Sequence, residues 1–407
     1  MAALLGVMWY QGLTVPLLAI VSPWIALQFS LDARAIARLY AVMSVSALIT
    51  FGAARLADRI GRRLLLLACL VSASATAVCA ALARSTVTFA IWEFLRFSAV
   101  GAIANIAYTL LAEAAPDSSA RASALGKGGM AAAAGGASLL VLMPVFSTWG
   151  HSFRWAYDLS AIGVLFVPAL LRWVPESQQW KRARVSGVVE RSSAFGVFGG
   201  RWSRRAVAII TASLLNGVEG AAVGAWSYYY GVLVVGISPQ VMSLLSVIAT
   251  LIGFAGFRVG AWAAERFGRV PTAVVFGAFH QAAALWLYLG PVKHVLSPPL
   301  WIGVGLCLSG FGASASGIAK STAIVELFPT ELRVTILGWV ALAGALATGC
   351  SNILVSVLVG PLGGISRAIA VLSLSGVLGL VVFGLLVDET RGMSLEQAAL
   401  EEGRPTR

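Results

Sequence analysis

Ionisable side chains inside apolar segments are the residues of this chain best suited to bind a charged solute or a proton. Glu93 and Arg96 stand in the apolar run 87–112, and their spacing of three residues makes them neighbours on one face of a helix. Such groups are costly inside a membrane and are usually functional. The pair is therefore a candidate proton-binding site, and a static ion pair that stiffens its helix is the alternative.

A second set of candidates lies on one face of the apolar run 206–230. At 100° per residue, its members fall within a wedge of about 80°. They are Asn216, Glu219, Val223, Trp226 and Tyr230. A polar and aromatic stripe on a membrane helix predicts the wall of a wet cavity. Glu219 is then a proton site or the partner of a cationic solute, or else a protonated carboxyl hydrogen-bonded inside the protein.

Of the remaining polar residues in the apolar runs, some are candidates for solute binding and others are expected to have only structural roles. Gln11 and Thr14 share a helix face in the first run and join the candidates for solute binding. His280 is expected to serve packing, and Lys320, near the end of its run, is expected to extend its ammonium to the membrane edge. No catalytic residue, metal site or cofactor motif is predicted.

Charged motifs between the apolar runs occur twice along the chain. Glu326 follows Glu113, and Glu389 follows Glu176, by the same 213 residues. The first set comprises Asp58, Arg59, Gly61, Arg62, Arg63, Glu113, Arg121 and Glu176. The second set comprises Glu265, Arg266, Gly268, Arg269, Glu326, Arg333 and Glu389. Charges at matching places in two apolar halves predict a duplicated membrane protein, with one charged cluster at an edge of each half.

The composition requires a bilayer around most of the chain. Of its 407 residues, 59% are hydrophobic and 11% are charged, whereas about a quarter of the residues of soluble domains are charged. Twelve runs are long and apolar enough to cross a membrane: 4–28, 36–57, 63–83, 87–112, 123–147, 155–174, 206–230, 240–262, 270–290, 299–322, 334–358 and 366–387. The net charge of +12 does not indicate nucleic-acid binding, because the basic residues gather in alternate connections.

These patterns predict an all-α membrane protein with twelve transmembrane helices in two pseudo-symmetric six-helix bundles. The bundles are expected at 1–174 and 206–390, joined by a cytoplasmic linker at 175–205 and followed by a cytoplasmic tail at 391–407. The linker is rich in arginine and lysine, which favours the cytoplasmic side. With an even number of spans, both termini are then cytoplasmic, in a bacterial-type inner (plasma) membrane.

The charged motifs resemble those of the major facilitator superfamily, whose fold consists of two such bundles. Leu56–Arg63 is similar to the family's loop between spans two and three. The segments Val325–Arg333, Val174–Ser177 and Asp388–Gly392 resemble the sugar porters and the metabolite–proton symporters within that superfamily. In the family these clusters hold the cytoplasmic ends together while the protein faces outward. The resemblance therefore implies a cytoplasmic gate built from the two charged sets.

The resemblance also bears on proton coupling. Arg96 matches an arginine that sugar porters carry in span four, where it couples to a protonatable carboxylate that usually lies on span one. Here span one has Gln11–Thr14, without an acid, where metabolite–proton symporters often have two. Glu93 or Glu219 is then the candidate to replace the missing acid, and the sequence leaves both open.

The sequence therefore predicts a secondary active transporter rather than an enzyme. It is expected to move a small polar organic solute, either a sugar or an organic or aromatic carboxylate, by alternating access with proton symport. The alternative is an antiporter that exports drugs or metabolites, and a remote alternative is a non-transporting membrane sensor. The expected partners are the solute, protons and lipid, with no cofactor and no nucleic acid, and the chain is expected to act as a monomer.

Overall fold

The computed structural model describes the chain except for residues 115–117, 149–151, 178–194, 201, 291–295 and 393–407. The predicted linker 175–205 and tail 391–407 therefore lie largely outside the described residues. The side chains of two predicted gate residues, Asp58 and Arg121, are also outside the described part.

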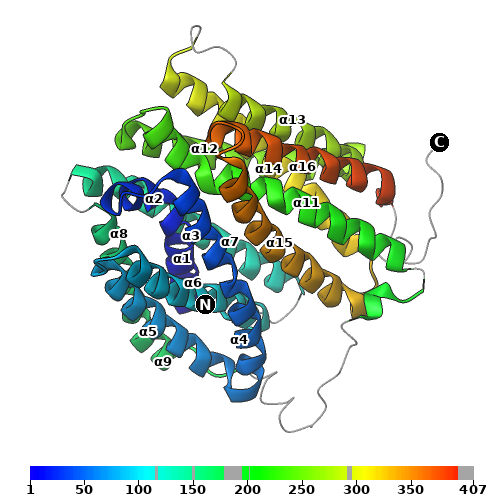
Figure 1. Ribbon diagram of the computed structural model, residues 1–407. Coiled ribbons are helices and arrows are strands. Elements are labelled where there is room, and N and C mark those ends of the chain that lie inside the picture. Colours follow the sequence, from blue (N-terminus) through cyan, green and yellow to red (C-terminus); the bar gives the residue numbers. More distant parts are fainter. Residues whose placement is uncertain (115–117, 149–151, 178–194, 201, 291–295, 393–407) are drawn as a thin grey trace. The chain divides into compact units, whose positions relative to one another are not determined.

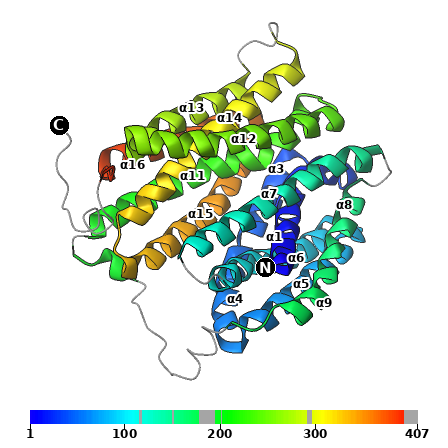
Figure 2. The same cartoon turned by 180° about the vertical axis from the view of Figure 1, so that it is seen from behind.

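The chain divides into two compact units, Met1–Glu190 with Ser238–Ser243 and Arg191–Ile237 with Leu244–Arg407 (Figures 1 and 2). The first half of the chain forms α1 (Ala2–Thr14), α2 (Leu17–Gln28), α3 (Ala33–Ser44), α4 (Ser46–Ile60), α5 (Arg62–Ala81), α6 (Thr86–Glu113), α7 (Ser118–Thr148), α8 (Ser152–Ser160), the 3-10 helix η1 (Ala161–Leu165) and α9 (Phe166–Trp173). The second half forms η2 (Gly196–Phe198), α11 (Trp202–Tyr229), the π-helical η3 (Tyr230–Val234), α12 (Pro239–Phe267), α13 (Arg269–Leu289), α14 (Pro298–Glu326), α15 (Thr330–Leu358) and α16 (Ile365–Leu386).

Twelve helical segments of the described chain are long and apolar enough to cross a bilayer, from Ala2–Gln28 to Ile365–Leu386. They coincide with the twelve predicted runs, because a membrane span must bury about 20 consecutive apolar residues whatever its neighbours are. The prediction of an all-α, twelve-span fold is confirmed. The chain is an integral multi-pass membrane protein.

Local sequence signals account for where several helices begin. Ser85 caps α6, since its hydroxyl accepts from the backbone N–H of Thr88 at 3.2 Å while the Thr88 side chain accepts from the Ser85 N–H. The helices α5 and α13 each follow a glycine with positive φ, Gly61 at 112° and Gly268 at 110°. Only glycine adopts this conformation without strain, so the sharp turn before both helices depends on it.

Close helix packing in both units depends on residues without bulky side chains. A Cβ atom added at Gly135 of α7 would lie 1.9 Å from the Trp9 carbonyl oxygen of α1. In the second unit, a Cβ at Gly312 of α14 would lie 2.9 Å from the backbone nitrogen of His280 on α13. Small residues let backbones approach closely where lipid supplies no hydrophobic driving force. Gly312 thereby brings α14 to the segment of α13 that carries His280.

Candidate functional site

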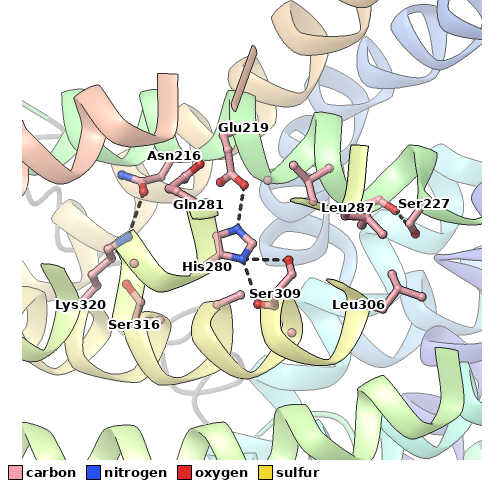
Figure 3. A pocket seen from close by; sticks show the side chains of 17 residues that line it. Asn216, Glu219, Ser227, His280, Gln281, Leu287, Leu306, Ser309, Ser316 and Lys320 are labelled. Carbon is pink, nitrogen blue, oxygen red and sulfur yellow. Dashed lines mark hydrogen bonds and ion pairs between the residues drawn. The ribbon is translucent and has the colours of Figure 1, made fainter. Parts of the chain in front are cut away.

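The second unit contains a polar cavity of about 420 Å³. Three helices line it: α11, α13 and α14. Figure 3 shows three ionisable side chains on its wall, each from a different helix. They are Glu219, His280 and Lys320. The volume falls within the range of small-molecule sites.

The cavity lies along the face of α11 that carries small residues. Asn216, Glu219 and Val223, three members of the predicted stripe, line the cavity together with Gly220 and Gly224. The glycines leave the open space, since they project no side chain into it.

Two aromatic members of the stripe, Trp226 and Tyr230, lie outside the cavity wall. Trp226 is 0% exposed and packs edge-on against Tyr229, with ring centroids 5.3 Å apart. The Tyr230 hydroxyl donates to the Tyr288 carbonyl oxygen at 3.1 Å. Neither ring is among the residues that line the cavity. The rings fill space between helices rather than offer a stacking surface there.

Glu219 and His280 form a hydrogen-bonded pair that continues to Ser309 (Figure 3). The distance from Glu219 Oε1 to His280 Nε2 is 2.7 Å. The other ring nitrogen, Nδ1, lies 2.9 Å from the Ser309 carbonyl oxygen and 3.0 Å from its hydroxyl. His280 therefore has a polar role, which differs from the packing role expected from the sequence. Helical periodicity does not determine which helix faces His280.

Lys320 also departs from its expected place. Its ammonium donates to Asn216 Oδ1 at 2.9 Å and lines the cavity, rather than extending to the membrane edge. Its charge interacts electrostatically with both Glu219 and His280. Gln281 completes the polar wall; its Oε1 is buried and has no hydrogen-bond partner among the described residues. The cavity thus offers a cation to a solute.

In the first unit, Glu93 and Arg96 are fully buried and bonded to one another. The Arg96 guanidinium donates from Nε and Nη2 to the two carboxylate oxygens of Glu93, both at 2.6 Å. Its third contact is to the Thr14 carbonyl oxygen at 3.0 Å, and its guanidinium lies over the Tyr157 ring at 5.4 Å from the centroid. The Thr14 hydroxyl turns back to the Tyr10 carbonyl oxygen, and Gln11 is half-buried. These contacts hold Arg96 against the break between α1 and α2 near Pro16, and they fit both the static ion pair and the proton-coupling role that the sequence leaves open.

The charged edge of the first unit is a compact network. The Glu176 carboxylate accepts from the backbone N–H groups of Arg62 at 3.0 Å and Arg63 at 3.1 Å, at the first turn of α5. Arg62 pairs with Glu113, which also accepts from the Ser177 hydroxyl at 2.6 Å. A carboxylate at a helix N-terminus satisfies N–H groups that have no partner within the helix.

The second unit repeats this network at the start of α13. Glu389 accepts from the N–H groups of Arg269 and Val270, both at 2.9 Å. The Arg269 guanidinium forms two bonds of 3.1 Å to Glu326, and Thr390 takes the place of Ser177. The duplication seen in the sequence is therefore a duplication of hydrogen bonds as well.

Three other predicted gate residues, Arg59, Glu265 and Arg266, are exposed. Among the described contacts, none joins them to Glu113, Glu176, Glu326 or Glu389. The arginines after the glycine, Arg62 and Arg269, meet the acids instead, because each begins a new helix that points its first turn at them. In the second unit, Arg333 donates from Nε to the Phe328 carbonyl oxygen at 2.9 Å.

Twelve apolar helices, two duplicated halves and a cavity with ionisable side chains on its wall are typical of a membrane transporter. A family model described as the Major Facilitator Superfamily matches residues 3–351. The chain belongs to this superfamily, and it transports small organic solutes.

Named relatives and solved structures are similar to most of the chain. A probable 4-methylmuconolactone transporter of Cupriavidus pinatubonensis is 27% identical, over 86% of this chain and 81% of its own length. A gentisate transporter of Corynebacterium glutamicum is 23% identical, over 70% of this chain and 64% of its own length. The crystal structure of a D-xylose–proton symporter has a TM-score of 0.76 at 18% identity, over 96% of this chain and 98% of that one.

Proposed function

We propose that this protein imports a small organic carboxylate together with protons. The observation that carries the proposal is the Lys320 ammonium, which is held inside the cavity of the second unit by Asn216. A cation in such a site favours an anion over a neutral sugar.

The names of the relatives support this choice of solute. 4-Methylmuconolactone and gentisate are the solutes in the names of the two relatives. Both are ring compounds with a carboxyl group that is ionised at neutral pH, and gentisate also carries two hydroxyl groups. Among the solutes predicted from the sequence, the carboxylate therefore has more support than the sugar. Efflux of drugs has no such support.

The mechanism we propose is alternating access in a bacterial-type inner membrane, with the chain as a monomer and both termini in the cytoplasm. The charged networks around Glu176 and Glu389 would form part of a cytoplasmic gate. Each ties the start of one helix to two other segments of its own unit, so it keeps the edge of that unit rigid. A rigid edge is what a bundle needs to move as a body.

Uptake into proteoliposomes tests the proposal. We expect radiolabelled gentisate to accumulate in vesicles with purified protein when the outside is more acidic than the inside, and D-xylose not to accumulate. Protein-free vesicles and vesicles without a pH gradient are the controls. Accumulation of xylose, or of no carboxylate among gentisate, 4-methylmuconolactone and benzoate, would refute the proposal.

A further inference from the structure

The hydrogen bonds of the Glu219–His280–Ser309 cluster fit two protonation states. His280 Nδ1 lies 2.9 Å from the Ser309 carbonyl oxygen and 3.0 Å from its hydroxyl. When the hydroxyl donates to Nδ1, Nε2–H donates to the Glu219 carboxylate at 2.7 Å and the imidazole is neutral. When Nδ1 instead donates to the carbonyl oxygen, the contact between Nε2 and Glu219 needs a second proton, on either the ring or the carboxyl group, and the pair then holds one proton more.

The pair and Lys320 together determine the charge of the cavity. With its extra proton the pair is neutral, so the cavity carries the single positive charge of Lys320. Without that proton, the Glu219 carboxylate balances Lys320, and the cavity is neutral. A net charge is costly inside a membrane protein. The pair with its extra proton (the loaded pair) therefore favours an anion beside Lys320, and the pair without that proton (the unloaded pair) opposes one.

Other groups around the pair do not alter this count. On α13, Gln281 is polar but does not ionise, and on α14 the hydroxyl of Ser316 donates to the Ala273 carbonyl oxygen. Helix α16 packs on α11 and α13 and meets Glu219 with Gly376, at which a Cβ would lie 2.8 Å from Glu219 Cγ. Helix α15 packs on α11 and contributes no lining residue. Among the described residues that line the cavity, Glu219, His280 and Lys320 are the ionisable ones.

We infer that Glu219 and His280 jointly carry the coupling proton, and that Lys320 links this proton to the solute carboxylate in a one-to-one, electroneutral symport. The inference rests on the proposed function and assigns its coupling site. Only two states of the cavity are neutral: empty with the pair unloaded, and occupied with the pair loaded. In both of these states the protein can change between its outward-facing and inward-facing conformations, whereas binding of a proton alone or an anion alone leaves a net charge in the cavity. The Glu219–His280 pair thereby replaces the acid that span one lacks.

The test compares three fluxes of gentisate in proteoliposomes of the full-length protein. The first is accumulation driven by a pH gradient, the second is accumulation driven by a potassium-diffusion potential, and the third is counterflow against unlabelled gentisate. Counterflow requires no net proton movement. For the wild type we expect accumulation with the pH gradient, none with an inside-negative potential alone, and a proton-to-gentisate flux ratio of one.

Glu219→Gln is the decisive variant. It removes the proton site but keeps Lys320, so we expect pH-driven accumulation to fall at least tenfold while counterflow stays within about threefold of wild type. Glu219→Asp keeps a carboxyl group and is expected to retain coupled accumulation. Asp32→Asn is the matched control, because it also removes one carboxylate, while asparagine still caps α3.

The outcomes separate this inference from the function on which it rests. If wild-type protein shows no gentisate counterflow, the proposed function fails and the inference with it. If wild-type protein transports gentisate but Glu219→Gln accumulates it equally well, only the coupling assignment is refuted. Loss of counterflow as well as accumulation in Glu219→Gln would place the carboxyl in solute binding instead of proton transfer. Accumulation driven by an inside-negative potential in the wild type refutes the electroneutral ratio whatever the variants do.

Discussion

Lys320 gives the sharpest prediction about solute recognition. Its ammonium is held 2.9 Å from Asn216 Oδ1 on the cavity wall, and a solute carboxylate beside it would gain a charge-assisted hydrogen bond. Such a bond contributes about 1.5–3 kcal/mol, and each 1.4 kcal/mol is tenfold in affinity, so Lys320→Gln is expected to weaken gentisate binding about 10- to 150-fold.

A neutral analogue separates the charge from the shape of the site. In 2,5-dihydroxybenzamide the carboxylate of gentisate is replaced by an uncharged amide, and glutamine can still hydrogen-bond to it. Its affinity is expected to change less than about threefold in Lys320→Gln, since no ion pair is lost. Titration calorimetry of the purified protein in detergent measures both ligands.

The control for this experiment is Lys127→Gln, which removes an exposed lysine of α7. We expect it to bind both ligands as the wild type does. An unchanged gentisate affinity in Lys320→Gln would contradict the role given to the ammonium. An equal loss for gentisate and the amide would show that the substitution disturbs the cavity rather than removing a charge contact.

Three further predictions concern stability, each measured as a change in thermal unfolding of the purified protein. Glu93→Gln leaves the fully buried Arg96 without its carboxylate and is expected to cost about 3–5 kcal/mol, whereas replacing both residues by leucine recovers much of that loss. Glu389→Gln weakens the acceptor of the N–H groups at the start of α13 and is expected to cost about 1–3 kcal/mol. Gly135→Val places side-chain atoms on the backbone of α1 and is expected to prevent folding, whereas Gly126→Ala meets no atom within 4 Å and is expected to change stability by less than about 1 kcal/mol.

Each of these predictions has an outcome that would contradict it. A wild-type melting temperature for Glu93→Gln would mean that Arg96 does not need the Glu93 carboxylate to offset the cost of burying its charge. Glu265→Gln removes an exposed carboxylate of the second unit, so a loss as large as that of Glu389→Gln would show that the N–H contacts are not the cause. A monodisperse, folded Gly135→Val protein would refute the close approach of α1 and α7.

Much of this fold could be predicted from the sequence, because its determinants are local. A span needs only about 20 consecutive apolar residues, and the duplication is visible as a nearly constant offset between motifs. Glu219 could likewise be recognised from the local sequence, since an ionisable residue inside an apolar run is unusual by itself. The same local signal is present for His280 and Lys320.

Which side chains meet was decided by the tertiary structure. Glu219, His280 and Lys320 come from α11, α13 and α14, and they face one cavity because glycines such as Gly312 let two of these helices approach. Helical periodicity gives the face of each helix but not its neighbour, so no spacing along the chain predicts a contact between residues 61 positions apart. The sequence by itself determined a twelve-span transporter with charged groups inside the membrane; the packing of the helices determined that three of those groups balance one another's charge.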